Sequence, residues 1–350
     1  MRRPRLAVVA SLVTPLLPAQ SGGAQAFLSD LASGLAGRGW RVTVYCREGS
    51  RVPGVELAGI PVEGEHLKAA LVRPRGGTAT RVPALALGFE RLFGELRRRG
   101  ADLVSQHAFD AEAIELAEGL PVLHTLHLPP VVPAVVEAVR AATAPFAVPS
   151  ESSRRGWAAA GLADPVVLRD GVPVFRPAPG PVQPVALVAG RISPEKGVAA
   201  AIRVARRAGL RPLVVGGAYD PAYFEAEVRP LLREGELLPA QSRGRLWRLM
   251  SQAAVSLLPI EWEEPFGLVA AESQMAGCPV VAYRRGALPE VVEEGVGGIL
   301  VEPGDEEALL PAIAAARRLD RGRIHESAAR RLALDATLDA YEQALEAVAS

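Results

Sequence analysis

The sequence predicts an α/β protein built from two domains, each with a parallel sheet. Short apolar runs of strand length alternate with amphipathic helical patterns throughout the chain, which is typical of βαβ units. The proline-rich segment Arg176–Pro184 can neither continue a helix nor pair as a central strand, so it is the expected linker. A length of 350 residues, 49% of them hydrophobic, provides enough apolar surface for two cores.

The first half begins with a predicted strand, a glycine loop and a helix in which Phe27, Leu31 and Leu35 repeat at helical spacing. A signal peptide is the alternative, because Arg2-Arg3 precedes an apolar run and Ala24-Gln-Ala26 imitates a cleavage site. We favour the uncleaved interpretation and a cytoplasmic location, since cleavage would remove the first strand and its loop. The predicted strands of this half are Leu6–Leu12, Arg41–Tyr45, Leu103–Gln106, Val122–His127 and Phe146–Val148.

The second half has the same alternation and ends in an amphipathic helical pattern over Arg323–Ala349. The expected domains are residues 1–175, residues 176–325, and a C-terminal helix over 326–350 that packs back on the first domain. Parallel sheets bind ligands outside the carboxyl ends of their strands, so we expect a cleft that faces those ends of both sheets. Gly49–Gly88 is poorly patterned and receives no element. The predicted strands are Val185–Ala189, Pro212–Val215, Val255–Pro259, Val280–Ala282 and Gly298–Val301.

The composition excludes several classes of protein. The formal net charge is zero, which disfavours a disordered chain and a partner such as nucleic acid. Cys46 and Cys278 lie in apolar stretches without metal-ligand spacing, so buried free thiols are expected. Apart from the N-terminus, no apolar run is long enough to span a bilayer.

Arginines gather in the middle of the first half. A solvated helix face accounts for most of them, and peripheral contact with a membrane surface or an anionic acceptor is the alternative. They are Arg73, Arg75, Arg81, Arg91 and Arg97–Arg99.

The segment Glu264-Pro-Phe-Gly-Leu-Val-Ala-Ala-Glu272 follows a predicted strand and opens a helix. At about 100° per residue, Glu272 falls between Leu268 and Ala276, inside the apolar stripe. An unpaired carboxylate is costly to bury there. A surface glutamate should lie on the polar side instead, so we interpret Glu272 as a carboxylate that meets the hydroxyls of a ligand.

A second loop, Gly190-Arg-Ile-Ser-Pro-Glu-Lys-Gly197, connects a predicted strand to a helix. Lysine occurs at only two positions in the chain, and one of them is Lys196 in this loop. Arg191 and Lys196 beside a helix N-terminus suit a diphosphate, above all one that gains negative charge as it leaves. The alternative is an ordinary helix start with exposed charges.

Two further features lie at predicted loops of the first half. Gly22 and Gly23 precede a helix, where glycines let backbone N–H groups approach an anion, although a simple tight turn has the same sequence. His127 ends a predicted strand and is favoured for the cleft, whereas His107 and His124 are expected to support it. No metal-ligand spacing accompanies these histidines.

Taken together, these segments resemble glycosyltransferase family 4, whose retaining enzymes have the GT-B fold. The resemblance extends over nearly the whole chain, and the joint presence of the Arg191…Lys196 and Glu264…Glu272 segments is its most specific part. It implies two Rossmann-like domains whose parallel sheets face a central cleft. It also implies transfer of a hexosyl unit from a UDP- or GDP-sugar to an acceptor hydroxyl of a sugar, a lipid-linked sugar or a small molecule.

The resemblance implies a role for each matching residue. Arg191 and Lys196 would bind the donor diphosphate, and Glu264 with the backbone of Phe266, Gly267 and Leu268 would hold the hydroxyls of the donor sugar. Glu272 would bind the ribose, Gly22 and Gly23 would close over the phosphates, and His127 would lie beside the transferred sugar. No cofactor or metal ion is expected, because the resemblance implies that Arg191 and Lys196 stabilise the negative charge of the diphosphate.

The chain departs from the family pattern at Leu237–Gln241, because the family often has a glycine near the turn that binds the nucleotide base. The sequence therefore does not identify the base of the donor. Two other functions share such an architecture: a nucleotide-sugar epimerase, and a non-catalytic sugar- or nucleotide-binding protein. A nicotinamide dehydrogenase would want Gly-x-Gly-x-x-Gly after a strand, which Ser21-Gly-Gly-Ala-Gln25 does not supply.

Overall fold

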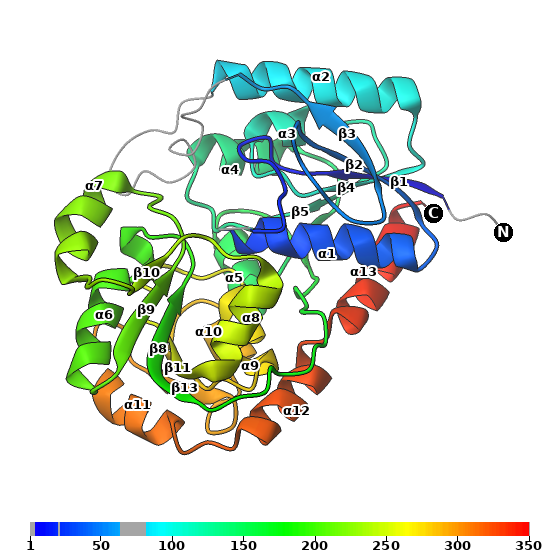
Figure 1. The fold of residues 1–350 in the computed structure, drawn as a ribbon. Coiled ribbons are helices and arrows are strands. Elements are labelled where there is room, and N and C mark those ends of the chain that lie inside the picture. Colours follow the sequence, from blue (N-terminus) through cyan, green and yellow to red (C-terminus); the bar gives the residue numbers. More distant parts are fainter. Residues whose placement is uncertain (1–3, 20–21, 64–81, 350) are drawn as a thin grey trace. The chain divides into compact units, whose positions relative to one another are not determined.

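The computed structural model describes residues 4–19, 22–63 and 82–349. The chain forms two compact units, one of residues 1–18, 24–169 and 335–350, the other of residues 19–23 and 170–334. Each unit contains one parallel sheet with helices on both faces, as Figure 1 shows. The predicted fold class is therefore confirmed.

The first unit has a seven-stranded sheet in the order β3-β2-β1-β4-β5-β6-β7. Its strands are β1 (Arg5–Val9), β2 (Arg41–Arg47), β3 (Glu56–Ile60), β4 (Leu103–Gln106), β5 (Val122–Thr125), β6 (Phe146–Val148) and β7 (Val166–Val167). Its helices are α1 (Gly23–Gly37), α2 (Pro83–Arg99), α3 (Ala111–Glu115), α4 (Pro133–Ala141), α5 (Glu151–Ala159) and α13 (Leu334–Val348).

Alternation along the strands of the first unit sends side chains to both faces of the sheet. Ala7 and Val9 of β1 join Tyr45 of β2 in a core cluster with Phe89 and Phe93 of α2. Helix α1 lies on the other side of the sheet (Figure 1). The first strand is thus covered on both faces, which explains why it reads as an unbroken apolar run.

The second unit has a six-stranded sheet in the order β10-β9-β8-β11-β12-β13. Its strands are β8 (Gln183–Ala189), β9 (Arg211–Val215), β10 (Leu237–Leu238), β11 (Ala253–Leu258), β12 (Val280–Tyr283) and β13 (Gly298–Val301). Its helical segments are η2 (Pro194–Lys196), α6 (Val198–Arg207), α7 (Pro221–Tyr223), η3 (Phe224–Val228), η4 (Arg229–Leu231), α8 (Arg243–Gln252), α9 (Leu268–Met275), α10 (Leu288–Val291), α11 (Leu309–Ala316) and α12 (Arg321–Arg331).

The two faces of the second sheet carry separate cores. Ala186 and Val188 of β8 pack with Ile202 of α6, while Val185 and Leu187 of the same strand pack with Met250 of α8. Cys278 belongs to the second of these cores, and burial raises the pKa of its thiol to about 12. Both cysteines are free and buried, as predicted.

Strand order decides where a ligand can bind in each unit. In the first sheet the chain runs outward from β1 to β3 and then returns to place β4 on the other side of β1. The second sheet does the same at β8 and β11. In open α/β sheets a ligand usually binds in a crevice outside the carboxyl ends of two such neighbouring strands. We therefore expect the ligand crevice of each unit beside the loops that follow these strands.

All ten predicted strands are present, and the described part of the chain has three further strands that were not predicted. Strands β7 and β10 have two residues each at sheet edges, too short for a periodic signal, and β3 (Glu56–Ile60) lies in the stretch that received no element. The predictions at Arg73, Arg75 and Arg81 lie outside the described residues.

The C-terminal pattern is two helices, α12 and α13, so the expectation of a single helix was wrong. Val172 pairs with Ala333 in a parallel bridge: its N–H donates to Leu332 O at 2.8 Å, and its carbonyl accepts from Leu334 N at 2.9 Å. This strand-like pairing uses backbone groups that a continuous helix would need. Helix α12 therefore groups with the second unit, and α13 from Asp335 onward groups with the first.

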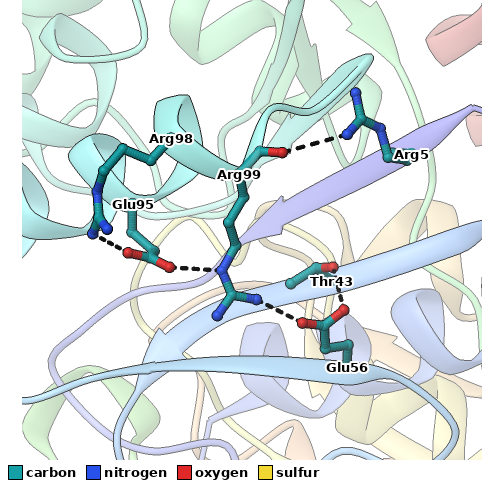
Figure 2. A network of polar contacts seen from close by, with 6 residues as sticks. All are labelled: Arg5, Thr43, Glu56, Glu95, Arg98 and Arg99. Carbon is teal, nitrogen blue, oxygen red and sulfur yellow. Dashed lines mark hydrogen bonds and ion pairs between the residues drawn. The ribbon is translucent and has the colours of Figure 1, made fainter.

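A polar network ties the C-terminal end of α2 to the strands beside it, as Figure 2 shows. Arg99 donates to Glu95 and to Glu56, each at 2.6 Å, and Arg5 donates to the carbonyl of Arg99 at 3.3 Å. The network borders a cavity of about 310 Å³ at the amino ends of β1 and β2, away from the carboxyl edge. These partners within one unit support the solvated-face interpretation for the arginines at the end of α2.

None of the described helices is long and apolar enough to cross a membrane.

Candidate active site

The loop after β8 carries Arg191 and Lys196. Its 3-10 turn ends at Gly197, which has φ of +64° and ψ of +27°. A Cβ at this position would lie 2.0 Å from the carbonyl oxygen of Pro259, just past the end of β11. Only glycine fits, for both its left-handed conformation and the lack of space. The loops after β8 and β11, the two strands at the crevice, are thereby in backbone contact.

Lys196 and Glu264 form the centre of this contact. Lys196 Nζ lies 2.6 Å from Glu264 Oε2, and both side chains are mostly buried. Trp262 Nε1 donates to the same carboxylate oxygen, and the Trp262 ring lies 4.9 Å from the ammonium group. The lysine is therefore held by an ion pair and a cation–π contact in a site that excludes much of the solvent.

Arg191 is held separately. Its guanidinium lies 4.7 Å from the ring centre of Tyr219 and 3.8 Å from Glu195. Glu195 in turn accepts from Ser193 Oγ at 2.6 Å, so the loop carboxylate is engaged on its own side. An ion pair at 3.8 Å is long, and an incoming anion can displace it more easily than it can displace the pair at Lys196.

The helix after β11 begins at the predicted position. Gly267 has φ of +95° and precedes the first residue of α9, Leu268, while Phe266 and Leu268 are buried. The first turn of a helix leaves N–H groups without intrahelical acceptors and carries partial positive charge. These groups can donate to the oxygens of a bound ligand.

Glu272 is buried, with 4% of its surface exposed, as the helical spacing predicts. Its Oε1 accepts from Arg243 Nη2 at 2.7 Å, from Arg243 Nε at 2.9 Å and from Trp247 Nε1 at 3.1 Å. The ring of Phe175, the residue before the predicted linker, stacks on Trp247 with 4.0 Å between the ring centroids. All three bonds fall on one carboxylate oxygen, which leaves the other oriented by the pair and able to accept from a hydroxyl group.

The remaining predicted residues follow β1 and β5, two strands of the seven-stranded sheet. Gly22 lies just before α1, which Gly23 begins, in the connection that follows β1. His127 lies two residues beyond the end of β5 and is buried. Strand β5 ends at Thr125, so the regular strand expected through His127 was two residues too long.

Three side chains of this edge form a buried chain. Ser105 Oγ lies 2.8 Å from His107 Nε2, and His107 Nδ1 lies 2.9 Å from His127 Nε2. Phe27 of α1 and Tyr341 of α13 pack on the two imidazoles. Burial lowers the pKa of His127 to about 4 and that of His107 well below its ordinary value, so both rings are neutral at pH 7.

Asp110 is a further titratable group at this edge that the sequence did not single out. It precedes α3 in the loop after β4 and is buried. Burial, together with the nearby charge of Glu112, raises its pKa to about 7. At neutral pH this carboxyl can therefore both donate and accept a hydrogen bond.

His124 gives a test of the burial at this edge. Burial lowers its pKa to about 4 from 6.5, and in the described part of the chain its Nδ1 has no hydrogen-bond partner. Between pH 6.5 and pH 4, His124 is protonated in the unfolded chain but neutral in the folded protein. The free energy of unfolding therefore falls as the pH decreases through this window. Between pH 7 and pH 5, wild type should lose about 2 kcal/mol of unfolding free energy relative to His124→Phe.

The measurement is urea unfolding of both proteins at the two pH values. Phenylalanine keeps the aromatic contact that His124 makes with Phe146 at 4.9 Å. Groups that do not interact with His124 titrate equally in both proteins and cancel in the difference. A difference that does not depend on pH would contradict the depressed pKa.

The structure joins some of the predicted site residues directly. Lys196 and Glu264 are in contact, whereas Arg191 and Glu272 have other immediate partners. The sequence missed Trp262, Tyr219, Arg243 and Trp247 as those partners. Trp262, two residues before Glu264 in a loop, was the only one with a local signal.

Comparison with known proteins agrees with this arrangement. The family model described as "Glycosyltransferase Family 4" matches residues 21–170, and the one described as "Glycosyl transferases group 1" matches residues 176–330. D-inositol 3-phosphate glycosyltransferase of Mycobacterium marinum is 35% identical over 150 residues, which is 41% of this chain and 32% of that protein. The corresponding enzyme of Mycolicibacterium vanbaalenii is 45% identical over 82 residues, covering 23% of this chain and 18% of that protein. The matched parts thus span a third or less of these relatives.

Solved structures resemble the chain over nearly its full length. Sucrose-phosphate synthase from Thermosynechococcus elongatus has a TM-score of 0.77 at 20% identity, with 99% of each chain covered. HepE from Anabaena in complex with UDP-glucose has a TM-score of 0.75 at 18% identity, with 99% of this chain and 100% of that one covered. At such identities the likeness is one of fold.

Proposed function

Because the chain belongs to glycosyltransferase family 4, we propose that it transfers a hexosyl unit from a nucleoside-diphosphate sugar to an acceptor hydroxyl, with retention at the anomeric carbon. The observation that carries the proposal is the mostly buried Lys196–Glu264 pair in the crevice loops of the second sheet, beside the N-terminus of α9. A cation, a carboxylate and free helix N–H groups together suit a sugar joined to a diphosphate.

In the proposed reaction the acceptor oxygen attacks the anomeric carbon on the face that the diphosphate leaves. The bond from that carbon to the phosphate oxygen breaks, and the leaving oxygen takes the proton of the acceptor hydroxyl. Charge develops on the diphosphate, so Lys196 and Arg191 stabilise the transition state more than the ground state.

The carboxylates are assigned to donor recognition. Glu264 and the backbone of Phe266, Gly267 and Leu268 bind hydroxyls of the sugar, and Glu272 binds the ribose. When the diphosphate binds, Lys196 contacts both the diphosphate and Glu264. The carboxylate of Glu264 can then also accept hydrogen bonds from hydroxyls of the sugar. Gly22 and Gly23 contact the phosphates, and His127 of the first unit contacts the transferred hexose.

UDP-glucose is the first donor to test, because HepE is described in complex with it. GDP-sugars remain in the proposal, since the base contacts near Leu237–Gln241 depart from the family pattern. For the acceptor we propose a hydroxyl of a sugar, a lipid-linked sugar or a small molecule, with peripheral membrane contact in the lipid-linked case. We also propose a cytoplasmic location, with which the two free, buried thiols are consistent.

The test is a thermal-shift panel of UDP, GDP, ADP and their sugars, followed by donor turnover with and without acceptors. A ligand that binds the folded protein raises its melting temperature. We expect one of the three nucleotides to raise the melting temperature. Because no metal is assigned to the reaction, the sugar donor that carries this nucleotide should still be turned over in the presence of EDTA. The absence of a shift with every nucleotide would contradict the proposal, and sugar interconversion without an acceptor would indicate an epimerase.

A further inference from the structure

We propose that His107 is a positioning residue that fixes His127 as the tautomer with its proton on Nδ1, through a hydrogen-bond chain that begins at the hydroxyl of Ser105. The significance of that tautomer for catalysis rests on the proposed function, which places His127 beside the transferred sugar. The evidence for the hydrogen bonds from Ser105 to His127 comes from the geometry of the first unit alone.

The direction of the chain follows from counting donors. A neutral imidazole carries one N–H, so the two contacts of His107 must be one donated and one accepted hydrogen bond. Either Ser105 donates to His107, which donates to His127, or His127 donates to His107, which donates to Ser105. The two directions leave the proton of His127 on different nitrogens.

Ser105 decides between the two directions. Its side chain is fully buried, and its contact with His107 is the single hydrogen bond its hydroxyl makes among the described residues. If Ser105 accepted from His107, its own O–H would be a buried donor without a partner, which costs about 1–3 kcal/mol. If Ser105 donates, its proton is used, and an oxygen left without a further bond costs less.

The Ser105 O–H therefore donates to His107 Nε2, and the His107 Nδ1–H donates to His127 Nε2. His127 must then carry its proton on Nδ1. The two rings are nearly parallel, at 19°, with centroids 5.2 Å apart, as in an edge-to-edge hydrogen bond. Phe27 and Tyr341 pack against them and hold this geometry.

The direct test is NMR of the full chain labelled with ¹⁵N-histidine, whose five histidines give a small set of ring signals. We expect His127 to have a protonated Nδ1 and an unprotonated Nε2 at pH 7. Ser105→Ala and His107→Leu should release this state into a mixture of tautomers. His107→Asn should retain it, because the amide nitrogen of asparagine can take the place of the donating Nδ1.

His124→Phe is the matched control, since it alters a buried histidine of β5 that takes no part in these hydrogen bonds, and it should leave the His127 signals unchanged. A proton on Nε2 of His127 in wild type would overturn the proposal. So would unchanged His127 signals in both Ser105→Ala and His107→Leu.

Hexosyl transfer supplies a second readout. His107→Leu should lower kcat by on the order of 10²-fold, as expected when a contacting group is misplaced, with a smaller change in donor KM. His107→Asn should recover most of the loss, which general damage to packing would not allow. The tautomer is measured without any substrate, so failure of the proposed function leaves that result interpretable, and an Nε2 proton would leave the proposed function standing.

Discussion

Replacing Lys196 by alanine is expected to lower the rate of hexosyl transfer by about 10²- to 10³-fold, the size of effect seen when one preorganised electrostatic group is removed. The lysine is held on two sides, paired with Glu264 at 2.6 Å and close to the Trp262 ring. Because leaving-group charge appears mainly in the transition state, the loss should fall on kcat more than on donor KM.

The matched control for Lys196→Ala is Arg203→Ala, which removes another cation paired with a glutamate, Glu306, on the exposed surface of the same unit. That pair is worth little, and turnover should stay at the wild-type level. Circular dichroism establishes that both variants are folded. Turnover of Lys196→Ala within a few-fold of wild type would refute the assignment of the leaving-group cation.

Replacing Glu272 should reduce both stability and donor binding, and two variants separate these effects. Glu272→Ala removes the carboxylate from a mostly buried pair with Arg243, which is expected to cost about 3 kcal/mol of unfolding free energy. If Glu272 also accepts from the ribose hydroxyls, Glu272→Gln should weaken binding of the nucleoside diphosphate by about 10- to 100-fold, since hydrogen bonds to a charged acceptor are the strong ones.

Arg243→Met provides the comparison, because it breaks the same pair but retains Glu272. Unfolding in urea measures stability, and isothermal titration of the nucleoside diphosphate measures affinity. We expect Arg243→Met to lose stability while it retains more affinity than Glu272→Gln. Equal affinity in Glu272→Gln and wild type would mean that Glu272 has a structural role alone.

The strands and both loop motifs could be predicted from the sequence because their signals are local. An apolar run such as Val255–Leu258 is long enough to require burial, and the buried position of Glu272 follows from helical spacing within one element. The two-residue strands β7 and β10 could not be found, because they are held in place by pairing with a neighbouring strand and have no pattern of their own.

The partners of the site residues were beyond the reach of the sequence for the same reason. Arg243 lies 29 positions from Glu272, and Lys196 lies 68 positions from Glu264. The break between α12 and α13 likewise depends on Val172, which is remote in sequence from Ala333. Nothing local at either end records such a pairing.

The sequence by itself determined the α/β class, the division into two halves and the loops that carry Arg191, Lys196, Glu264 and His127. These follow from hydrophobic periodicity and turn chemistry, which act over a few residues. The tertiary structure decided that β1 lies beside β4 and β8 beside β11, which brings those loops to the crevices, and that His107 bonds His127. Strand order and long-range hydrogen bonds arise from the packing of whole elements, so no short stretch of sequence encodes them.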